Sequence, residues 1–167
     1  YDNGSYEIKV TDENGDSKTM LVKNGNDILP LKSYDEIVEI DSEGNATINE
    51  FNKNDLITKK TVYDSNGNVE FSREFEYDNA GNKTKVTHKN AEGNIIKYNE
   101  YEYNENNKRT KEIDRNADGS PIESSEYEYS DAGNVIKRTD ALYSEGKVTS
   151  STEYEYNDGN VVKSTKS

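Results

Sequence analysis

The sequence predicts an all-β protein, an extended antiparallel meander of repeated hairpins in a single-layer or thinly covered sheet of about 12–14 strands. Three observations predict this fold. A block in which glutamate alternates with an aromatic residue recurs after 26, 26 and 27 residues. Glycine-containing turn signals separate segments long enough for one strand each. Only 29% of the residues are hydrophobic, which suits a sheet that needs little core.

Residues 1–47 are expected to form an N-terminal capping β segment. They keep turn signals such as Asn14-Gly15 but lack the 26-residue repeat, and they hold the densest apolar stretches, at 20–22, 28–31 and 37–40. The open end of a repeat array has to be capped, so an atypical terminal segment is expected. Pro30 cannot donate a ladder hydrogen bond and is expected at an edge or a bend.

Residues 48–167 are expected to form an array of hairpin repeats that is continuous with the cap as one domain. The predicted copies are 48–73, 74–99, 100–125, 126–152 and, incompletely, 153–167. Four of them open on the alternating block: Glu74-Phe75-Glu76-Tyr77, Glu100-Tyr101-Glu102-Tyr103, Glu126-Tyr127-Glu128-Tyr129 and Glu153-Tyr154-Glu155-Tyr156. Each full copy has room for two strands of about eight or nine residues joined by hairpin turns.

The turn residues predict the register of the hairpins. A three-residue loop closed by glycine over 130–134 would pair Tyr129 with Val135. The last copy is one residue shorter, and a two-residue Asp-Gly turn over 157–160 would pair Tyr156 with Val161. Asn107 occupies the one vacant glycine position, where asparagine tolerates a positive φ.

This register places an aromatic side chain opposite a basic one in each hairpin. The expected pairs are Tyr77 with Lys83, Phe75 with Lys85, Tyr103 with Arg109, Tyr101 with Lys111, Tyr127 with Lys137, and Tyr154 with Lys163. One face would then carry alternating aromatic and basic columns with some cation–π character. The opposite face would carry the glutamates.

Composition and charge exclude several classes of function. The net charge of −13 at pH 7 and the pI near 4.6 argue against binding to nucleic acid or to anionic membranes. Cysteine is absent, so disulfides and thiol chemistry are excluded. No apolar run approaches the roughly 18 residues that span a bilayer. The chain begins at Tyr1 without methionine, and we expect that a signal peptide or longer precursor preceded it.

Tyrosine, aspartate and glycine recur at fixed offsets in three segments: Tyr63-Asp64-Ser65-Asn66-Gly67-Asn68, Tyr77-Asp78-Asn79-Ala80-Gly81-Asn82 and Tyr129-Ser130-Asp131-Ala132-Gly133-Asn134. With these segments, residues 48–167 resemble the bacterial YD-repeat (Rhs-like) family. The period is longer than that family usually shows, and nothing resembles the proteolytic core or toxin segment of its large members. The resemblance implies a secreted or bacterial cell-surface β-repeat protein with carbohydrate binding as an expected property, and it does not imply an enzyme.

No catalytic constellation, cofactor site or metal site is predicted. Residues 114–120 match the start of an EF-hand loop, but Ser125 stands where the loop needs a bidentate glutamate, and a hairpin turn explains the segment better. His88 is the only histidine, and we expect it in a strand on the glutamate face. The regular spacing of the glutamates favours a solvated face over a single catalytic pair.

The function favoured by the sequence is a non-enzymatic binding or adhesion module for a glycan or a surface protein. The candidate ligand-binding residues are the aromatic members of the blocks: Phe75, Tyr77, Tyr101, Tyr103, Tyr127, Tyr129, Tyr154 and Tyr156. The alternative is a purely structural spacer or assembly element, in which the rings cover the sheet and pack on lysine stems. Charged edge strands, with Lys163 and Lys166 in the last one, predict a monomer.

Overall fold

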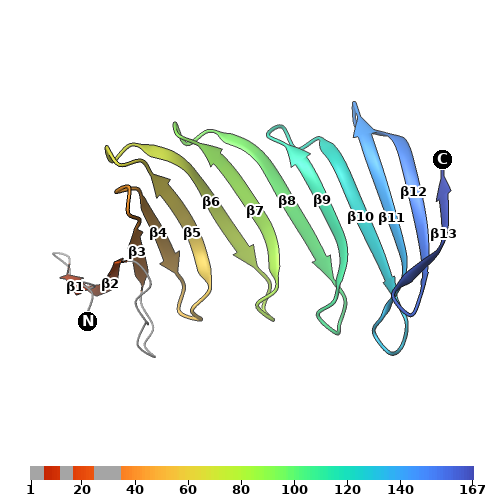
Figure 1. Ribbon diagram of the computed structural model, residues 1–167, viewed down its shortest axis with the longest axis horizontal. Helices are drawn as coiled ribbons and strands as arrows, with labels where there is room; N and C mark the ends of the chain where they lie inside the picture. Colours follow the sequence, from red (N-terminus) through yellow and green to blue (C-terminus); the bar gives the residue numbers. More distant parts are fainter. Residues whose placement is uncertain (1–5, 12–16, 25–34) are drawn as a thin grey trace. The chain divides into compact units, whose positions relative to one another are not determined.

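The computed structural model describes residues 6–11, 17–24 and 35–167, and all regular structure among them is β (Figure 1). The strands follow one another in chain order as a 13-stranded sheet, which confirms the predicted all-β meander. Their bounds are β1 Tyr6–Thr11, β2 Ser17–Asn24, β3 Glu36–Ile40, β4 Ala46–Phe51, β5 Ile57–Tyr63, β6 Val69–Tyr77, β7 Lys83–Asn90, β8 Ile95–Tyr103, β9 Arg109–Asn116, β10 Pro121–Tyr129, β11 Val135–Ser144, β12 Lys147–Asn157 and β13 Asn160–Lys166. The expected turn at Asn14-Gly15 and the expected bend at Pro30 lie outside the described residues.

The strands divide into two compact units. The first combines Tyr1–Phe75 with His88–Ile95, and the second combines Glu76–Thr87 with Ile96–Ser167. Within each unit the strands lie side by side in one layer (Figure 1). The boundary expected between residues 47 and 48 falls inside β4, and the division into a cap and an array stays a prediction.

The first unit contains the one departure from antiparallel pairing among the register pairs of its described strands. β2 and β3 run parallel, with Met20 opposite Glu36 and Leu21 opposite Ile37. β1 with β2, and β3 through β6, pair antiparallel. Leu21, in the apolar stretch at 20–22, is fully buried, and Met20 and Val22 beside it are half-buried. A single sheet offers few such positions, because each face has only side chains to cover it.

In the second unit, β8 through β13 form antiparallel hairpins with the turns that the sequence predicts. Tyr129 pairs with Val135, Tyr156 pairs with Val161, and the short last turn pairs Asn157 with Asn160. Asp158 and Gly159 both have positive φ, at 48° and 80°, as a two-residue type I′ turn requires. Asn107 fills the vacant glycine position with φ at 58°. These predicted registers and turn geometries are confirmed.

Most of the longer turns share one hydrogen-bonded design. In 64–68, the Asp64 N–H donates to the Asn68 carbonyl and the Gly67 N–H donates to the Asp64 carbonyl. The Asp64 carboxylate accepts from the N–H groups of Asn66 and Asn68 and from the Asn68 side chain. The same pattern holds at 41–45 and 78–82. A first residue whose carboxylate accepts from the N–H groups two and four residues later fixes the turn locally.

Each neighbouring strand pair from β4 to β6 and from β8 to β13 carries a β-bulge that was not predicted from the sequence, whereas β1 with β2 and β3 with β4 pair without one. In β11, Val135 pairs with Tyr129 but Lys137 pairs with Glu128, so Ile136 is passed over in the ladder. Residues Thr58, Glu70, Thr110, Ile122, Thr149 and Val162 are passed over in the same way at the starts of their strands. A bulge adds one residue to one strand, so every later side chain of that strand moves to the other face.

The sheet has little core in either unit. Among the described residues, the buried hydrophobic side chains are Leu21, Val86 and Ile113, and Thr61, Ser72, Thr87 and Ser124 are buried polar side chains. Several bulge residues are exposed, with Ile136 at 42% and Val162 at 60%. A thinly covered sheet is therefore the fold in each unit. No helix of the described chain is long and apolar enough to cross a membrane.

Candidate functional site

The bulges change which residues face the tyrosines. Tyr103 pairs with Arg109 as predicted. Beyond the bulge, Tyr101 pairs with Glu112 and Tyr127 pairs with Arg138, where the sequence predicted Lys111 and Lys137. Those two predictions are therefore wrong, because one extra residue in β9 and one in β11 turn the lysines to the other face.

The last hairpin shows the same correction. Tyr154 pairs with Ser164 instead of the predicted Lys163. The register expected for Tyr77 with Lys83 and for Phe75 with Lys85 stays a prediction.

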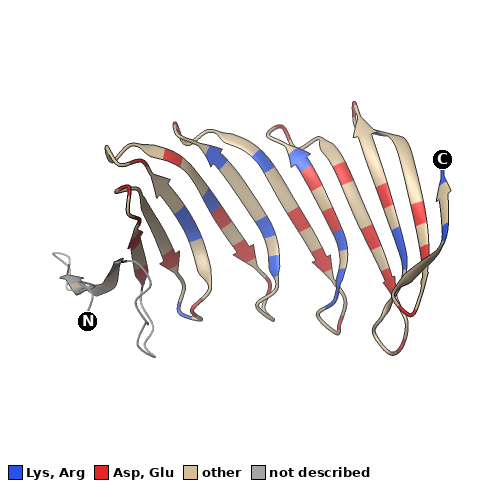
Figure 2. Ribbon diagram, viewed as in Figure 1, with Lys and Arg blue, Asp and Glu red and all other residues tan. Residues whose placement is uncertain are grey.

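The lysines share the opposite face with the glutamates. Lys111 pairs with Glu102 in the ladder, and its ammonium group lies 2.7 Å from a carboxylate oxygen of Glu126 in the next hairpin. Lys137 likewise pairs with Glu128 and lies 2.7 Å from Glu153. Figure 2 shows acidic and basic positions on the strands of this part of the sheet. Hydrogen bonds to glutamate raise the pKa of Lys111 and Lys137, so both lysines carry their charge at neutral pH.

The tyrosine face of the second unit carries a row in which tyrosine alternates with arginine. The guanidinium carbon of Arg109 lies 5.7 Å from the ring centre of Tyr101 and 5.6 Å from that of Tyr127. Arg138 pairs with Tyr127 in the ladder and lies 5.9 Å from the ring centre of Tyr154. These distances lie within the range of cation–π attraction. The row, called here the Tyr–Arg row, consists of Tyr101, Arg109, Tyr127, Arg138 and Tyr154.

The second tyrosine of two blocks joins consecutive hairpins through its hydroxyl group. Tyr103 donates to the Lys83 carbonyl at 2.9 Å, and Tyr129 donates to the Arg109 carbonyl at 2.6 Å. Donors and acceptors are each 26 residues apart, so the contact repeats with the sequence. Lys108 adds another contact between hairpins, because its ammonium group donates to the Gly133 carbonyl at 2.8 Å.

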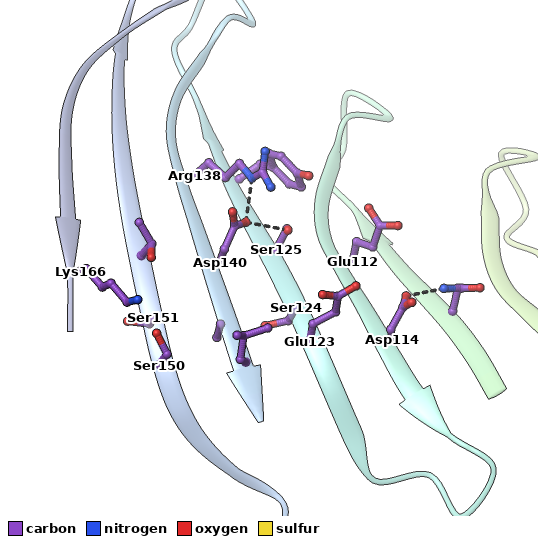
Figure 3. Close-up of a pocket in the computed structure, with 15 residues that line it drawn as sticks. Glu112, Asp114, Glu123, Ser124, Ser125, Arg138, Asp140, Ser150, Ser151 and Lys166 are labelled. Carbon is purple, nitrogen blue, oxygen red and sulfur yellow. Dashed lines mark hydrogen bonds and ion pairs between the residues drawn. The ribbon is translucent and has the colours of Figure 1, made fainter. Parts of the chain in front are cut away.

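An open groove of about 490 Å³ lies on the tyrosine face across β8 to β13 (Figure 3). Its aromatic lining residue is Tyr127. Polar and charged side chains make up most of the remaining lining, among them Asn99, Glu112, Asp114, Glu123, Ser125, Arg138, Asp140, Ser150, Thr152 and Lys166. They come from neighbouring strands at positions that share a face, which is how a flat sheet can assemble a site from residues far apart in sequence.

Hydrogen bonds and ion pairs hold the polar side chains of the groove. Ser125 Oγ donates to Asp140 Oδ1 at 2.7 Å, and Arg138 Nε donates to the same oxygen at 2.7 Å (Figure 3). The bond to Asp140 raises the pKa of the Arg138 guanidinium, which stays charged. This network therefore fixes the middle of the groove.

The acidic end of the groove is paired in the same way. Asp114 accepts a hydrogen bond from Asn99 and lies 3.7 Å from the ammonium group of Lys97. Glu112 lies 3.1 Å from Arg109. Burial, together with the charges of Glu112 and Asp114, raises the pKa of the Tyr101 hydroxyl, so this tyrosine is neutral at physiological pH.

A second recess of about 670 Å³ adjoins the turns on the same face. It is lined by Tyr127, Arg138 and Tyr156 and by turn residues that include Gly133 and Gly159. Tyr127 and Arg138 line both hollows. The two hollows therefore adjoin at Tyr127 and Arg138, which are the two members of the Tyr–Arg row that line them.

All eight aromatic residues predicted for the site are half-buried. Phe75 belongs to the first unit and the other seven to the second. Tyr127 and Tyr156 line the hollows, Tyr101 and Tyr154 belong to the Tyr–Arg row, and Tyr103 and Tyr129 join hairpins. The polar lining was not predicted from the sequence, although Ser125 and Asn99 stand two residues before Tyr127 and Tyr101, and this spacing places them on the aromatic face.

The two segments of the sequence with metal-ligand residue types, 114–120 and the strand around His88, form a hairpin turn and part of β7. Residues 116–120 form a hairpin turn, which confirms the expectation for this segment: the Asn116 N–H donates to the Ser120 carbonyl at 2.9 Å. Within the described chain, no group of three or more histidine, cysteine, aspartate or glutamate side chains could hold a metal ion. His88 lies next to Lys89, which contacts Glu74, so His88 faces away from the glutamates and that expectation was wrong.

Comparisons with known proteins found likenesses among solved structures. One is the crystal structure of TcdB2-TccC3-TEV, with a TM-score of 0.36 and 18% sequence identity over 74% of this chain and 9% of that chain. Another is TcdB2-TccC3-Cdc42, with a TM-score of 0.32 and 14% identity over 75% of this chain and 9% of that chain. This chain thus spans about a tenth of the length of those chains. No protein-family model and no curated protein matches it.

Proposed function

We propose that this chain is a non-enzymatic β-repeat module, secreted or on a bacterial cell surface, that binds an extended ligand across its tyrosine face. The observation that carries the proposal is the open groove beside Tyr127, built from side chains of successive repeats. Concave sites lined by an aromatic ring and a few fixed polar groups are the usual form of a ligand site. The ligand is a glycan or a surface protein. The module acts as a monomer, and it binds neither nucleic acid nor anionic membrane.

The paired state of the groove carboxylates supports binding over catalysis. Asp140 is held by Ser125 and Arg138, and Glu112 is held by Arg109. A carboxylate held in an ion pair by an arginine has to give up that partner before it can exchange a proton with a substrate. Its oxygens remain suitable as hydrogen-bond acceptors for a ligand.

The turns add support for a relationship with bacterial YD-repeat proteins. Asp64 and Asp78 each follow a tyrosine and cap a turn that ends in glycine and asparagine. The Tyr-Asp pattern thus has a physical role in the turn, since the aspartate fixes the loop and the tyrosine ends the strand. We propose membership in this family for residues 48–167.

A second function, a structural spacer or assembly element, is favoured by a separate observation. Tyr103 and Tyr129 use their hydroxyl groups to join hairpins, and Arg109 lies between two tyrosine rings. Rings engaged in this way stabilise the array whether or not a ligand binds.

The experiment that separates the two functions is the double variant Tyr101→Ser/Tyr127→Ser, compared with the double variant Glu102→Gln/Glu128→Gln on the other face. Both proteins are labelled and applied to glycan arrays and to bacterial cells, and their Tm values are measured. The binding module predicts that only the tyrosine variant loses binding. Unchanged binding in that variant, together with a Tm loss of several degrees, would establish the spacer instead.

A further inference from the structure

The geometry points to a ligand class for the groove: we infer that it takes a neutral oligosaccharide and discriminates against acidic ones. This inference rests on the proposed binding function and names its ligand. Three properties of the groove carry it, namely paired charges, a lining of hydroxyl and amide groups, and a floor whose central strands are paired on both sides.

The charges of the groove are already balanced by the chain itself. Asp140 contacts Arg138, Glu112 contacts Arg109, and Asp114 contacts Lys97, at 2.7, 3.1 and 3.7 Å. The fourth lining carboxylate, Glu123, shares the groove with the lining ammonium group of Lys166. The lining thus holds four carboxylates and two cations, Arg138 and Lys166. Arg109 and Lys97, which lie outside the lining, pair with Glu112 and Asp114, so a cationic ligand gains little net attraction.

An acidic ligand meets unfavourable groups in the same place. The arginine that could bind a carboxylate or sulfate, Arg138, is held by Asp140 and lies over the Tyr154 ring. An acidic sugar there would have to share the Arg138 guanidinium with Asp140, and it would also lie near Asp114 and Glu123 (Figure 3). Like charges brought together in a partly desolvated groove are repelled.

The remaining groups match sugar hydroxyls. Ser125, Ser150 and Thr152 offer hydroxyl groups and Asn99 an amide, while the Tyr127 ring provides an apolar surface against which a sugar ring can lie. The apolar part of the lining is otherwise confined to Ala141 and Leu142. An oligosaccharide rather than a single sugar follows from the geometry, since Tyr127 and Arg138 connect the groove to the second recess.

The floor disfavours a peptide ligand. β9 to β12 are each paired on both sides, so these four strands have no free edge below the groove. β13, the last strand of the sheet, lines the groove only through Lys166. An extended peptide that binds by strand addition needs such an edge. A peptide that binds by its side chains needs apolar pockets, which Ala141 and Leu142 alone do not provide.

The test uses calorimetry of the purified chain with four probes: cellohexaose, chitohexaose, hexagalacturonate and hexalysine. We expect at least one neutral hexasaccharide to bind and the other two probes to fail at about 0.15 M salt. Tyr127→Ser should weaken the neutral sugar about tenfold or more. Glu128→Gln, in the same strand on the other face, is the control and should bind normally, and circular dichroism establishes that both variants fold.

The outcomes separate this inference from the proposed function. Binding of hexagalacturonate or hexalysine that depends on Tyr127, without binding of a neutral sugar, overturns the inference and leaves the proposed function intact. Failure of all four probes also overturns the inference. The proposed function then stands only if the array or cell experiment detects binding that the Tyr101/Tyr127 double variant loses. Neutral-sugar binding that persists in Tyr127→Ser also overturns it.

Discussion

At the scale of single residues, the turns depend on a few positions with unusual backbone or hydrogen bonding. Gly133 has φ at +81°, and a Cβ there would lie 2.7 Å from the Cε and Nζ atoms of Lys108. Gly119 has φ at +85° with no atom within 4 Å of the same point. An alanine at Gly119 would meet backbone strain alone, whereas an alanine at Gly133 would meet backbone strain and a clash with the Lys108 side chain.

We expect Gly119→Ala to lower the free energy of unfolding by about 1 kcal/mol, because an alanine at positive φ is strained. Gly133→Ala should lose more, since its methyl group also displaces the Lys108 ammonium group from the Gly133 carbonyl. Urea unfolding of both variants measures the difference. Equal losses would mean that the Lys108 contact contributes nothing.

The turn aspartates predict how stability depends on acidity. Hydrogen bonds from Asn68 and Asn82 lower the pKa values of Asp64 and Asp78 below the usual 3.8. A folded pKa below the unfolded one gives stability that is present above the unfolded value and is lost as the pH falls through the folded pKa. The Tm should therefore fall as the pH drops below about 4.

The reciprocal variants test this assignment. Asp64→Asn keeps the acceptor oxygen but cannot be protonated in this range, so its Tm should fall less between pH 5 and pH 2. Asn90→Asp should gain acid sensitivity, because the N–H of Asn94 already donates to the side chain at position 90. Identical pH profiles for the wild type and both variants would contradict the role of these turns.

At the scale of elements, side-chain contacts between neighbouring hairpins hold the hairpins together. Removing the Tyr129 hydroxyl in Tyr129→Phe deletes a hydrogen bond to the Arg109 carbonyl and should cost about 1 kcal/mol of unfolding free energy. Tyr127→Phe is the matched control in the same strand, since within the described chain its hydroxyl donates no hydrogen bond. A loss of the same size in both variants would refute a hairpin-joining role for Tyr129.

The Lys–Glu face offers a charge-reversal test. Lys111→Glu places a negative charge beside Glu126 and should lower stability by about 0.2–1 kcal/mol, the usual value of an exposed ion pair. The double variant Lys111→Glu/Glu126→Lys should recover most of the loss. The effect should shrink at 1 M salt, where charges are screened. No recovery in the double variant would mean that the two side chains do not interact.

The hairpins also show how far the sequence could predict the structure. The turn residues were sufficient to predict that Tyr129 pairs with Val135 and Tyr156 with Val161. Loop length and positive φ values determine which residues pair next to a hairpin turn. The bulge that follows the pair next to the turn could not be predicted from residue type, because Thr, Glu, Ile and Val all occupy the bulge position. Charge complementarity was the available signal, since a shift of one residue places Glu128 opposite Lys137.

The candidate site was predictable only in part for the same reason. Tyr127 was identified from its block, but Arg138 and Asp140 reach the tyrosine face only through the bulge at Ile136. A register without that bulge places both residues on the other face. The groove therefore could not be assembled from the sequence, although its aromatic member could.

At the scale of the whole molecule, each repeat in the second unit contacts mainly its neighbours. Ladder pairs, the Tyr129 hydroxyl and the Lys111–Glu126 pair all join adjacent strands or adjacent hairpins. The stability of such an array is approximately the sum of the stabilities of its repeats and of the interfaces between neighbouring repeats. The number of repeats can then change without a change of fold.

Deletion of residues 100–125 should therefore leave a folded β protein with a lower Tm. The junction joins Asn99 to Glu126 and restores an alternating block at the end of a strand. Deletion of 104–116 is the control, because it removes one strand with its turn and reverses the direction in which the chain continues. Circular dichroism and thermal melting compare the two. A cooperative melt for the control and none for the 26-residue deletion would contradict a repeat array.

The Tyr–Arg row gives the protein an optical property. The chain has 13 tyrosines and no tryptophan, so its intrinsic fluorescence comes from tyrosine alone. Tyr101, Tyr127 and Tyr154 are close to guanidinium groups, and Tyr127 also lines the groove. Ultraviolet emission from the unlabelled protein therefore reports on the stacked rings directly, and it can follow folding and occupancy of the groove without an attached dye.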